Sequence, residues 1–267
     1  MDASIFLADG EHFAPTEHAR GPWDPRALHG GAPAALITSA FESVEPGAEL
    51  QIARLGFELL RPVPFAPLHI STSIVRAGRR VQELTAEMHS GEDLICRASA
   101  LRVQAVPGEL PDDLSVERLT SVAAGPMPGP EHGTAVRFAL DDLDRASFAA
   151  SAMEMRWIDD PWTPGPGRVW MRLRHPLLPG HELTPLARLA ATADFANGVS
   201  AVLPFDRFLF INADLTIHLQ RQPRGEWIGL DARTLLHEGG TGLSDSVLHD
   251  EHGPVGRSFQ TLVVQPR

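Results

Sequence analysis

The sequence is poor in cysteine and in cationic side chains. Cys96 is the single cysteine among 267 residues, so a disulfide within the chain and a zinc site built from several cysteines are both excluded. Aspartate and glutamate outnumber lysine and arginine by 34 to 23, which gives a formal net charge of −11. A nucleic-acid-binding protein needs a basic footprint, so we expect no nucleic-acid partner. The cysteine usage fits a reducing cytoplasm.

Long apolar segments are also missing. No hydrophobic run is long enough to span a bilayer, and residues 1–5 lack the basic segment and apolar core of a signal peptide. Hydrophobic residues make up 43% and charged residues 21%, which is typical of globular proteins. We therefore expect a globular protein without a membrane span, of a length that suits two domains.

Hydrophobic periodicity predicts the same elements twice. In the first half, apolar spacing predicts a helix over residues 32–44, and extended patterns follow at 50–61, 67–76, 81–89 and 94–106. In the second half, a helix over 184–197 lies between strands predicted at 134–140, 150–158, 168–175, 207–220, 227–236, 243–248 and 255–264. Residues 107–130 are rich in Pro, Gly, Asp and Glu and read as a linker.

The two halves align in order. Phe41 in the first predicted helix corresponds to Phe195 in the second, and Cys96-Arg97 corresponds to Gly256-Arg257. This order favours a duplication, in which one helix is wrapped by a mostly antiparallel sheet in residues 1–106 and again in 131–267. The alternative is an ordinary α+β protein with chance similarity between its halves.

Three motifs resemble a known family. His29-Gly30-Gly31 before a helix resembles hotdog thioesterases, whereas Ala193-Asp194-Phe195 and the closing residues 253–260 resemble acyl-CoA thioesterase II (TesB-like) proteins. The resemblance implies an α+β double hotdog fold and hydrolysis of acyl-CoA without a cofactor. It also implies a catalytic set of Asp, Thr or Ser, and Gln, which falls on Asp194, Asn212 and Gln260.

Asp194 is the candidate general base, a role that the resemblance favours over a structural one. Thioester hydrolysis needs an activated water, a group that takes its proton, and donors for the developing oxyanion. Asp194 follows Leu186 and Ala190 on one i, i+4 row of the predicted helix, and a carboxylate on an apolar row needs a partner or a purpose. The alternative is an Asp that satisfies the end of its helix at Asn197-Gly198.

The other two family positions carry open questions. Asn212 cannot relay a proton as a hydroxyl can, and Asp214 is a substitute to consider. Alternate residues around Asn212 form an apolar face, so Asn212 reaches the site only through a bulge or a local twist. Gln260 lies in a predicted strand, where it would hold the attacking water or simply face solvent.

The N-terminus of the first helix is the candidate substrate-binding part. Gly30 and Gly31 can offer backbone N–H groups to an oxyanion, or they merely permit a tight start to the helix. His29 keeps a second function open, because a His–Asp pair would suit a hotdog hydratase or dehydratase. A third alternative is a non-catalytic acyl-CoA-binding double hotdog.

The remaining expectations concern metals and assembly. His249-Asp250-Glu251-His252 has metal-ligand residue types but lies in a predicted hairpin turn, so we expect no metal. Cys96 lies in an apolar strand and reads as a core residue. Ala40 stands where Asp194 would align, so one working site per chain is expected. The free sheet edges of a double hotdog predict a homo-oligomer.

Overall fold

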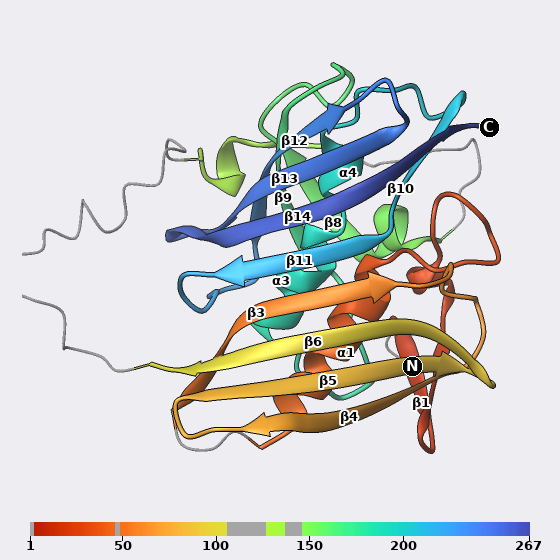
Figure 1. Cartoon of the computed structure of the whole chain (residues 1–267). Helices are drawn as coiled ribbons and strands as arrows, with labels where there is room; N and C mark the ends of the chain where they lie inside the picture. Colours follow the sequence, from red (N-terminus) through yellow and green to blue (C-terminus); the bar gives the residue numbers. More distant parts are fainter. Residues whose placement is uncertain (1–2, 46–48, 106–126, 137–145) are drawn as a thin grey trace, which may run out of the picture.

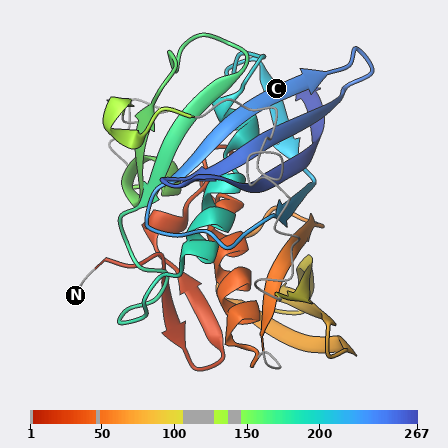
Figure 2. The same ribbon diagram turned by 90° about the vertical axis from the view of Figure 1, so that its left-hand side faces the viewer.

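One antiparallel sheet wraps the central helices. The computed structural model of the chain describes residues 3–45, 49–105, 127–136 and 146–267. Within these ranges the strands follow the order β1-β2-β4-β5-β6-β3-β11-β14-β13-β12-β9-β8-β7, with β10 beside β14. Figure 1 shows this sheet in front of the helices, and Figure 2 shows it curving around them. The double hotdog fold is thereby confirmed.

The elements of the first half lie where hydrophobic periodicity places them, apart from a short hairpin. The bounds are β1 Phe6–Asp9, β2 His12–Pro15, η1 Glu17–Ala19, α1 Gly31–Ser43, β3 Leu50–Leu59, β4 Leu68–Ala77, β5 Val81–Ser90 and β6 Asp93–Gln104. The predicted helix and all four predicted strands are present to within two residues at each end. The β1–β2 hairpin was not predicted, because four residues carry too little alternation to indicate a strand.

The second half repeats this plan with more irregularity. The bounds are η2 Pro130–His132, β7 Thr134–Ala135, η3 Phe148–Ala152, β8 Met153–Trp157, β9 Gly167–Leu173, α3 Pro185–Ala193, α4 Ala196–Val199, β10 Phe208–Asn212, β11 Asp214–Leu219, β12 Ile228–Leu236, β13 Thr241–Asp250 and β14 Gly253–Pro266. Two predicted elements are each divided: the helix over 184–197 becomes α3 and α4, and the strand over 207–220 becomes β10 and β11.

Parts of three predictions fall outside the described residues. They are residues 137–140 of the strand predicted at 134–140, residues 137–145 of the predicted second half, and residues 107–126 of the predicted linker. The boundaries 1–106, 107–130 and 131–267 therefore stay predictions. The cytoplasmic setting and the homo-oligomer also stay predictions. None of the helices in the described ranges is long and apolar enough to cross a membrane.

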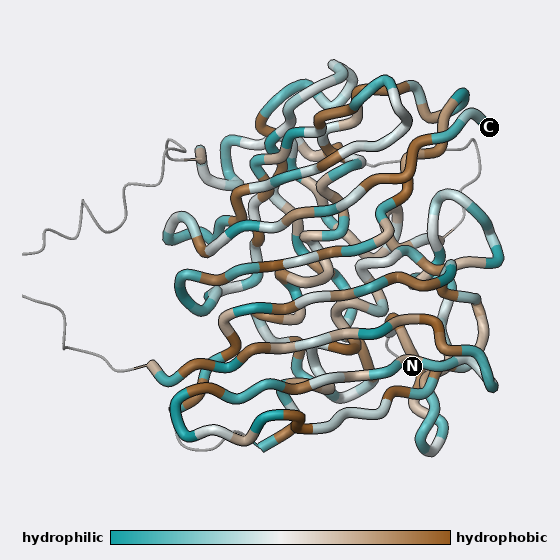
Figure 3. The backbone as a smooth tube through the Cα atoms, in the orientation of Figure 1, coloured by the Kyte–Doolittle hydropathy of each residue, from teal (hydrophilic) through white to brown (hydrophobic). Residues whose placement is uncertain are grey.

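The strand order reads the same outward from the centre of the sheet. β3 pairs with β11 from Asp214↔Glu58 to His218↔Arg54, and β6 and β14 lie beside them on either side. Figure 3 shows hydrophobic and hydrophilic residues interleaved along these strands. This alternation buries one face of the sheet against the helices.

The two main helices pack against each other at close range. A Cβ atom on Gly31 of α1 would collide with the carbonyl oxygen of Ala191 in α3, so glycine is required for this approach. Because α1 comes from the first half and α3 from the second, the two units share one core. The junction of these helices is where the site residues gather.

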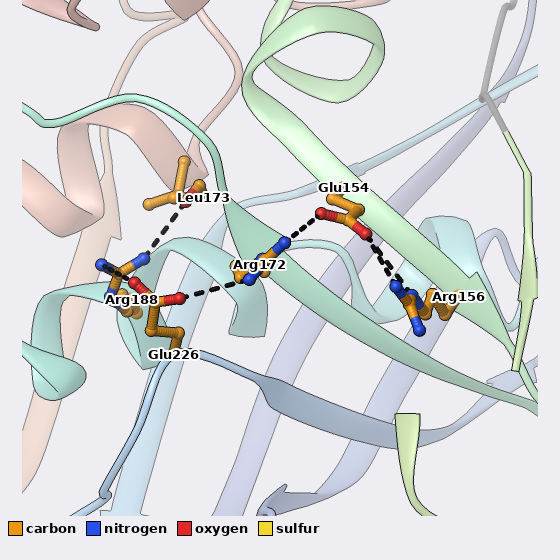
Figure 4. Close-up of polar contacts among 6 residues, drawn as sticks. All are labelled: Glu154, Arg156, Arg172, Leu173, Arg188 and Glu226. Carbon is orange, nitrogen blue, oxygen red and sulfur yellow. Dashed lines mark hydrogen bonds and ion pairs between the residues drawn. The ribbon is translucent and has the colours of Figure 1, made fainter. Parts of the chain in front are cut away.

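A polar network ties α3 to the sheet beside it. Arg188 of α3 donates to the carbonyl oxygen of Leu173 at 3.2 Å and to Glu226 at 3.2 Å. Arg172 of β9 bridges Glu226 to Glu154 of β8, at 3.3 and 2.7 Å (Figure 4). These bonds hold α3, whose last turn leads into Asp194, against β8 and β9.

Candidate active site

Asp194 lies at a break in the second central helix. Thr184 caps the N-terminus of α3 by accepting from the Ala187 N–H, and Pro185 occupies the first turn, where its missing N–H costs nothing. The helix ends at Asp194, and α4 starts two residues later. Asp194 is only 5% exposed, so its carboxylate is withdrawn from bulk water. A buried carboxylate requires partners for its oxygens.

Both oxygens of Asp194 have such partners, from different halves of the chain. Asn212 donates its Nδ2 to Oδ1 at 2.8 Å, and His29 Nδ1 lies 3.0 Å from Oδ2. A Cβ atom on Gly30 would lie 2.7 Å from Oδ2, so the missing side chain leaves room for the carboxylate. His29 and Gly30 come from the first half, and the site is therefore assembled across the junction of the two units.

The proton on His29 is placed by its neighbours. Its Nδ1 faces the Asp194 carboxylate and also lies 3.1 Å from the Gly31 backbone nitrogen. Nδ1 cannot donate to the carboxylate and accept from the Gly31 N–H at the same time. A hydrogen bond to an ionised carboxylate is the stronger of the two, so we assign the proton to Nδ1. In this tautomer Nε2 is an acceptor.

Asn212 reaches Asp194 because the strand carries a bulge. Asn212 pairs with Leu262 of β14, whereas Thr216 pairs with Phe259, so four steps on one strand oppose three on the other. The extra residue changes which side chains face the core. The bulge that we expected for Asn212 is therefore present, between β10 and β11.

Asp214 points elsewhere. Its Oδ1 accepts from the Thr261 backbone N–H at 2.6 Å, and it lines a hollow on the outer face of the sheet with Thr216 and His218. The idea that Asp214 substitutes for the family hydroxyl is wrong, because its side chain is on the opposite side of the strand from Asp194. The bulge causes this: it puts Asn212 inside and Asp214 outside.

Gln260 is buried completely and bound to backbone at both ends of its amide. Its Nε2 donates to the carbonyl oxygen of Asp194 at 3.1 Å, and its Oε1 accepts from the Asn197 N–H at 3.1 Å. These two bonds span the break between α3 and α4. Gln260 does not line the cleft beside Asp194. It holds the segment that carries the carboxylate.

Asn197 is a site residue that sequence reasoning treated only as part of a turn. It is 7% exposed, and its Nδ2 donates to the carbonyl oxygen of Phe210 at 3.0 Å. It also lines the cleft beside Asp194. An Asn three residues after an Asp near a helix end is common, so the sequence offered no signal for this placement.

The N-terminus of α1 faces Asp194. The helix begins at Gly31 with Gly30 as its N-cap, and no side chain caps its first turn. Within the described residues, the Gly30 N–H makes no hydrogen bond to another backbone group. The unpaired N–H groups of a helix start carry partial positive charge, which favours an anionic ligand. Gly30 thus lies beside the Asp194 carboxylate, and the role of Gly30 and Gly31 as oxyanion donors stays a prediction.

A cleft of about 550 Å³ opens onto these groups. Asp194, Asn212, His29 and Gly30 line it, and much of the remaining wall is apolar. That wall includes Trp23, Leu28, Leu59, Leu60, Val63, Leu209, Ile211 and Val263. A cleft of this size suits a small-molecule ligand rather than a macromolecule.

The other candidates from the sequence lie apart from the cleft. Burial raises the pKa of the Cys96 thiol to about 12, so Cys96 stays protonated and is a poor nucleophile. His249 and Asp250 are buried, whereas Glu251 and His252 are exposed, so these four side chains do not converge. No cluster of three or more His, Cys, Asp or Glu suited to a metal ion occurs in the described parts of the chain.

Sequence comparison gives the family directly. The profile of the acyl-CoA thioesterase N-terminal domain matches residues 19–103, and that of the C-terminal domain matches residues 110–264. The chain belongs to the acyl-CoA thioesterase family. The resemblance drawn from its motifs is therefore confirmed. The curated proteins, by contrast, include no match to the chain.

Solved structures share the fold at low sequence identity. The acyl-CoA thioesterase II TesB2 from Mycobacterium marinum is 18% identical with a TM-score of 0.65, covering 91% of this chain and 92% of its own. A hot dog fold protein from Alicyclobacillus acidocaldarius is 18% identical with a TM-score of 0.71, covering 100% and 97%. The tesB protein of Mycobacterium avium subs paratuberculosis is 14% identical with a TM-score of 0.63, covering 98% and 96%.

Proposed function

We propose that this thioesterase family member hydrolyses acyl-CoA to free acid and CoA, with Asp194 as the general base. The observation that carries the proposal is a buried carboxylate fixed on one oxygen by Asn212 and facing His29 on the other, at a cleft large enough for a thioester. A carboxylate held in this way keeps one orientation, and its remaining lone pairs can accept from a water bound in the cleft. A water held there can be deprotonated as it attacks.

The reaction balances with groups of the chain alone. The water oxygen bonds to the thioester carbonyl carbon while its proton passes to Asp194. The carbonyl oxygen becomes an oxyanion beside the N-terminus of α1, where the Gly30 N–H donates to it. The carbon–sulfur bond then breaks. CoA leaves as a thiolate that takes the proton from Asp194, and the carboxylate is restored.

Gln260 acts through Asp194 in this scheme, whereas Asn212 contacts both Asp194 and the attacking water. Asn212 supplies Nδ2 to the carboxylate, and its second N–H lies 3.4 Å from the Asp214 carbonyl oxygen. Its Oδ1 remains to accept from the attacking water. The amide nitrogen of Asn212 must be the atom that faces Asp194, because an ionised carboxylate can accept hydrogen bonds but cannot donate them. Gln260 is a positioning residue, because its amide fixes backbone and not substrate.

One observation favours a second function, a hotdog hydratase. The contact of 3.0 Å between His29 Nδ1 and Asp194 Oδ2 is the acid–base pair that addition of water to an enoyl-CoA would use. The imidazole, oriented by the carboxylate, would then move the protons through Nε2. Within that scheme Asn212 would hold Asp194 as the orienting group.

Two assays on the wild-type protein separate these functions. Thiol release from acetyl-CoA, butyryl-CoA and octanoyl-CoA, followed with a thiol reagent, measures hydrolysis. Loss of the conjugated absorbance of crotonyl-CoA without thiol release measures hydration. We expect thiol release from saturated acyl-CoA. Hydration without any thiol release would overturn the proposal in favour of the hydratase, and tight binding without either reaction would indicate a binding protein.

A further inference from the structure

A second, much smaller hollow adjoins the cleft on the far side of His29. It shares Pro22, Trp23, His29 and Asn197 with the cleft, so these residues border both spaces. Its volume is about 50 Å³, against about 550 Å³ for the cleft. The hollow lies between the second central helix and strands β8 and β9.

The walls of this hollow are apolar on both sides. The sheet contributes Met155, Trp157 and Met171, all at most 4% exposed. From the helix come Phe195 and Val199, also buried. These residues close the hollow with hydrocarbon, thioether and aromatic surface, which favours an apolar ligand.

The orientation of a bound thioester follows from the two spaces. The ring of Phe195 stacks on His29 at 4.1 Å between centroids, and His29 contacts Asp194, so the wall of the hollow reaches the ring beside the carboxylate. A carbonyl carbon beside Asp194 therefore lies in the cleft and near the hollow, with His29 bordering both. The long CoA arm fits only the cleft, where Arg61 also lies. The acyl chain is left to the hollow.

The volume limits the length of that chain. A water needs a space of roughly 10–15 Å³, so a hollow of about 50 Å³ accommodates about four groups of that size. We propose that the hollow bounded by Met155, Trp157, Met171, Phe195 and Val199 is the acyl subsite and that it selects short aliphatic acyl groups of about four to five carbons. This inference rests on the proposed hydrolysis.

The test is the dependence of kcat/KM on acyl length in the wild-type enzyme. We expect a maximum at butyryl-CoA or pentanoyl-CoA. We also expect a fall of at least about tenfold by octanoyl-CoA, because added methylenes find no space. Benzoyl-CoA, with its larger rigid acyl group, is expected to be a poor substrate. Values of kcat/KM that rise through octanoyl-CoA and dodecanoyl-CoA would overturn the proposal.

Two variants test whether this hollow sets the limit. Met171→Ala enlarges it and is expected to move the maximum to hexanoyl-CoA or longer. Gly198→Leu adds a side chain at a lining residue where a Cβ has room, and is expected to favour acetyl-CoA. Met88→Ala is the matched control: Met88 and Met171 are both 0% exposed strand residues, but Met88 lies in β5, away from the hollow.

The outcomes are separable from those of the proposed function. If Met171→Ala and Met88→Ala keep the same length profile, and Gly198→Leu does so as well, the hollow is not the acyl subsite. If no acyl-CoA is cleaved, calorimetric binding of butyryl-CoA and octanoyl-CoA decides. Tighter binding of butyryl-CoA, with the preference lost in Met171→Ala, supports the subsite even though hydrolysis has failed. Equal binding of the two overturns it.

Discussion

The two central helices meet at two junctions, each formed by the start of one helix and the end of the other. The side chains at the two junctions differ. With Phe41 aligned to Phe195, Gly30 corresponds to Thr184 and Ala40 to Asp194. At the Gly30–Asp194 junction, the start of α1 has no side-chain cap and a carboxylate lies beside it. At the corresponding Thr184 junction, the start of α3 is capped by the Thr184 hydroxyl.

The Thr184 junction is closed by its own side chains. The hydroxyl of Thr184 also donates to Glu42 Oε2 of α1 at 2.7 Å, so the acidic group there is already engaged. Burial raises the pKa of Glu42, and the bond from Thr184 opposes that rise. A helix start that caps itself has fewer N–H groups to offer an oxyanion. The same fold is used twice, but the start of the helix is left without a side-chain cap only where Gly30 stands in place of Thr184.

The supporting strands differ in the same way. With Cys96 aligned to Gly256, Gln260 of β14 corresponds to Ala100 of β6, which is equally buried but apolar. The end of α1 is instead held by Arg102, whose guanidinium donates to the carbonyl oxygens of Phe41 and Val44. Arg102 stabilises the C-terminal end of α1. Gln260 instead binds the backbone on both sides of the break between α3 and α4.

Substituting the two helix starts tests the comparison most severely. Gly30→Ala places a Cβ 2.7 Å from Asp194 Oδ2, so the carboxylate must move. We expect kcat/KM to fall by about 10²-fold, the usual cost of misplacing a reacting group by about 1 Å. Thr184→Ala is the matched control. It should lower stability by about 1 kcal/mol through loss of the cap and leave turnover near normal. Equal losses of activity in the two variants would show that the junctions do not differ in function.

A smaller effect is expected at Asn212. Asn212→Ala removes the donor to Asp194 Oδ1, and we expect kcat to fall by about tenfold, with KM little changed, because the carboxylate loses its orientation. Asn212→Thr restores a donor of the family type and should recover part of the loss. A rise in KM without a fall in kcat would mean that Asn212 binds substrate and does not position the base.

The two buried glutamines, Gln260 and Gln82, are expected to differ in their effect on activity. Gln260→Ala leaves the Asp194 carbonyl oxygen and the Asn197 N–H unpaired, at a cost of about 1–3 kcal/mol in the free energy of unfolding. We expect kcat to fall a few-fold as well. Gln82→Ala is the control, because Gln82 is a buried strand residue of the first half that binds Arg102. It should lower stability alone. Full activity in Gln260→Ala would remove Gln260 from the positioning of Asp194.

His249 in the last hairpin is expected to affect stability without affecting turnover. Burial lowers the pKa of His249 to about 4, below its ordinary 6.5, so the unfolded chain binds more protons between these values. Stability is therefore full above about pH 6.5 and is lost as the pH falls toward 4, by about 3 kcal/mol for this group. His249→Gln should reduce the fall in unfolding free energy between pH 7 and pH 4.5, measured with urea.

The matched control for that measurement is His89→Gln. His89 lies at the corresponding place in the first-half hairpin and is half-buried, not buried. It should leave the pH dependence close to that of the wild type. If both variants change the slope equally, burial of His249 is not the cause.

The fold could largely be predicted, because it follows from local patterns. Apolar spacing placed α1 and the strands of the first half, since each element buries one face. The short β1–β2 hairpin and the division of α3 from α4 escaped prediction. The first carries too little alternation, and the second depends on Gln260, which lies in a strand distant along the sequence.

The candidate site was predictable in composition and not in arrangement. Motifs indicated Asp194, Asn212, Gln260 and His29-Gly30-Gly31, and the structure brings them to one junction. The contact between His29 and Asp194 joins the two halves, so no local pattern reveals it. Which side chain the bulge turns inward was also beyond the sequence: Asn212 and Asp214 were both candidates until the strand register separated them.

The most direct test of the central claim is the turnover of Asp194→Asn beside that of Glu42→Gln. Both substitutions are nearly isosteric and remove a carboxylate at corresponding junctions. We expect Asp194→Asn to keep its melting temperature within a few degrees and to lower kcat for butyryl-CoA by roughly 10²–10⁴-fold, the usual range for loss of a positioned base. Glu42→Gln should retain the parent rate. Hydrolysis by Asp194→Asn at the parent rate would contradict the claim, whatever the melting temperatures show.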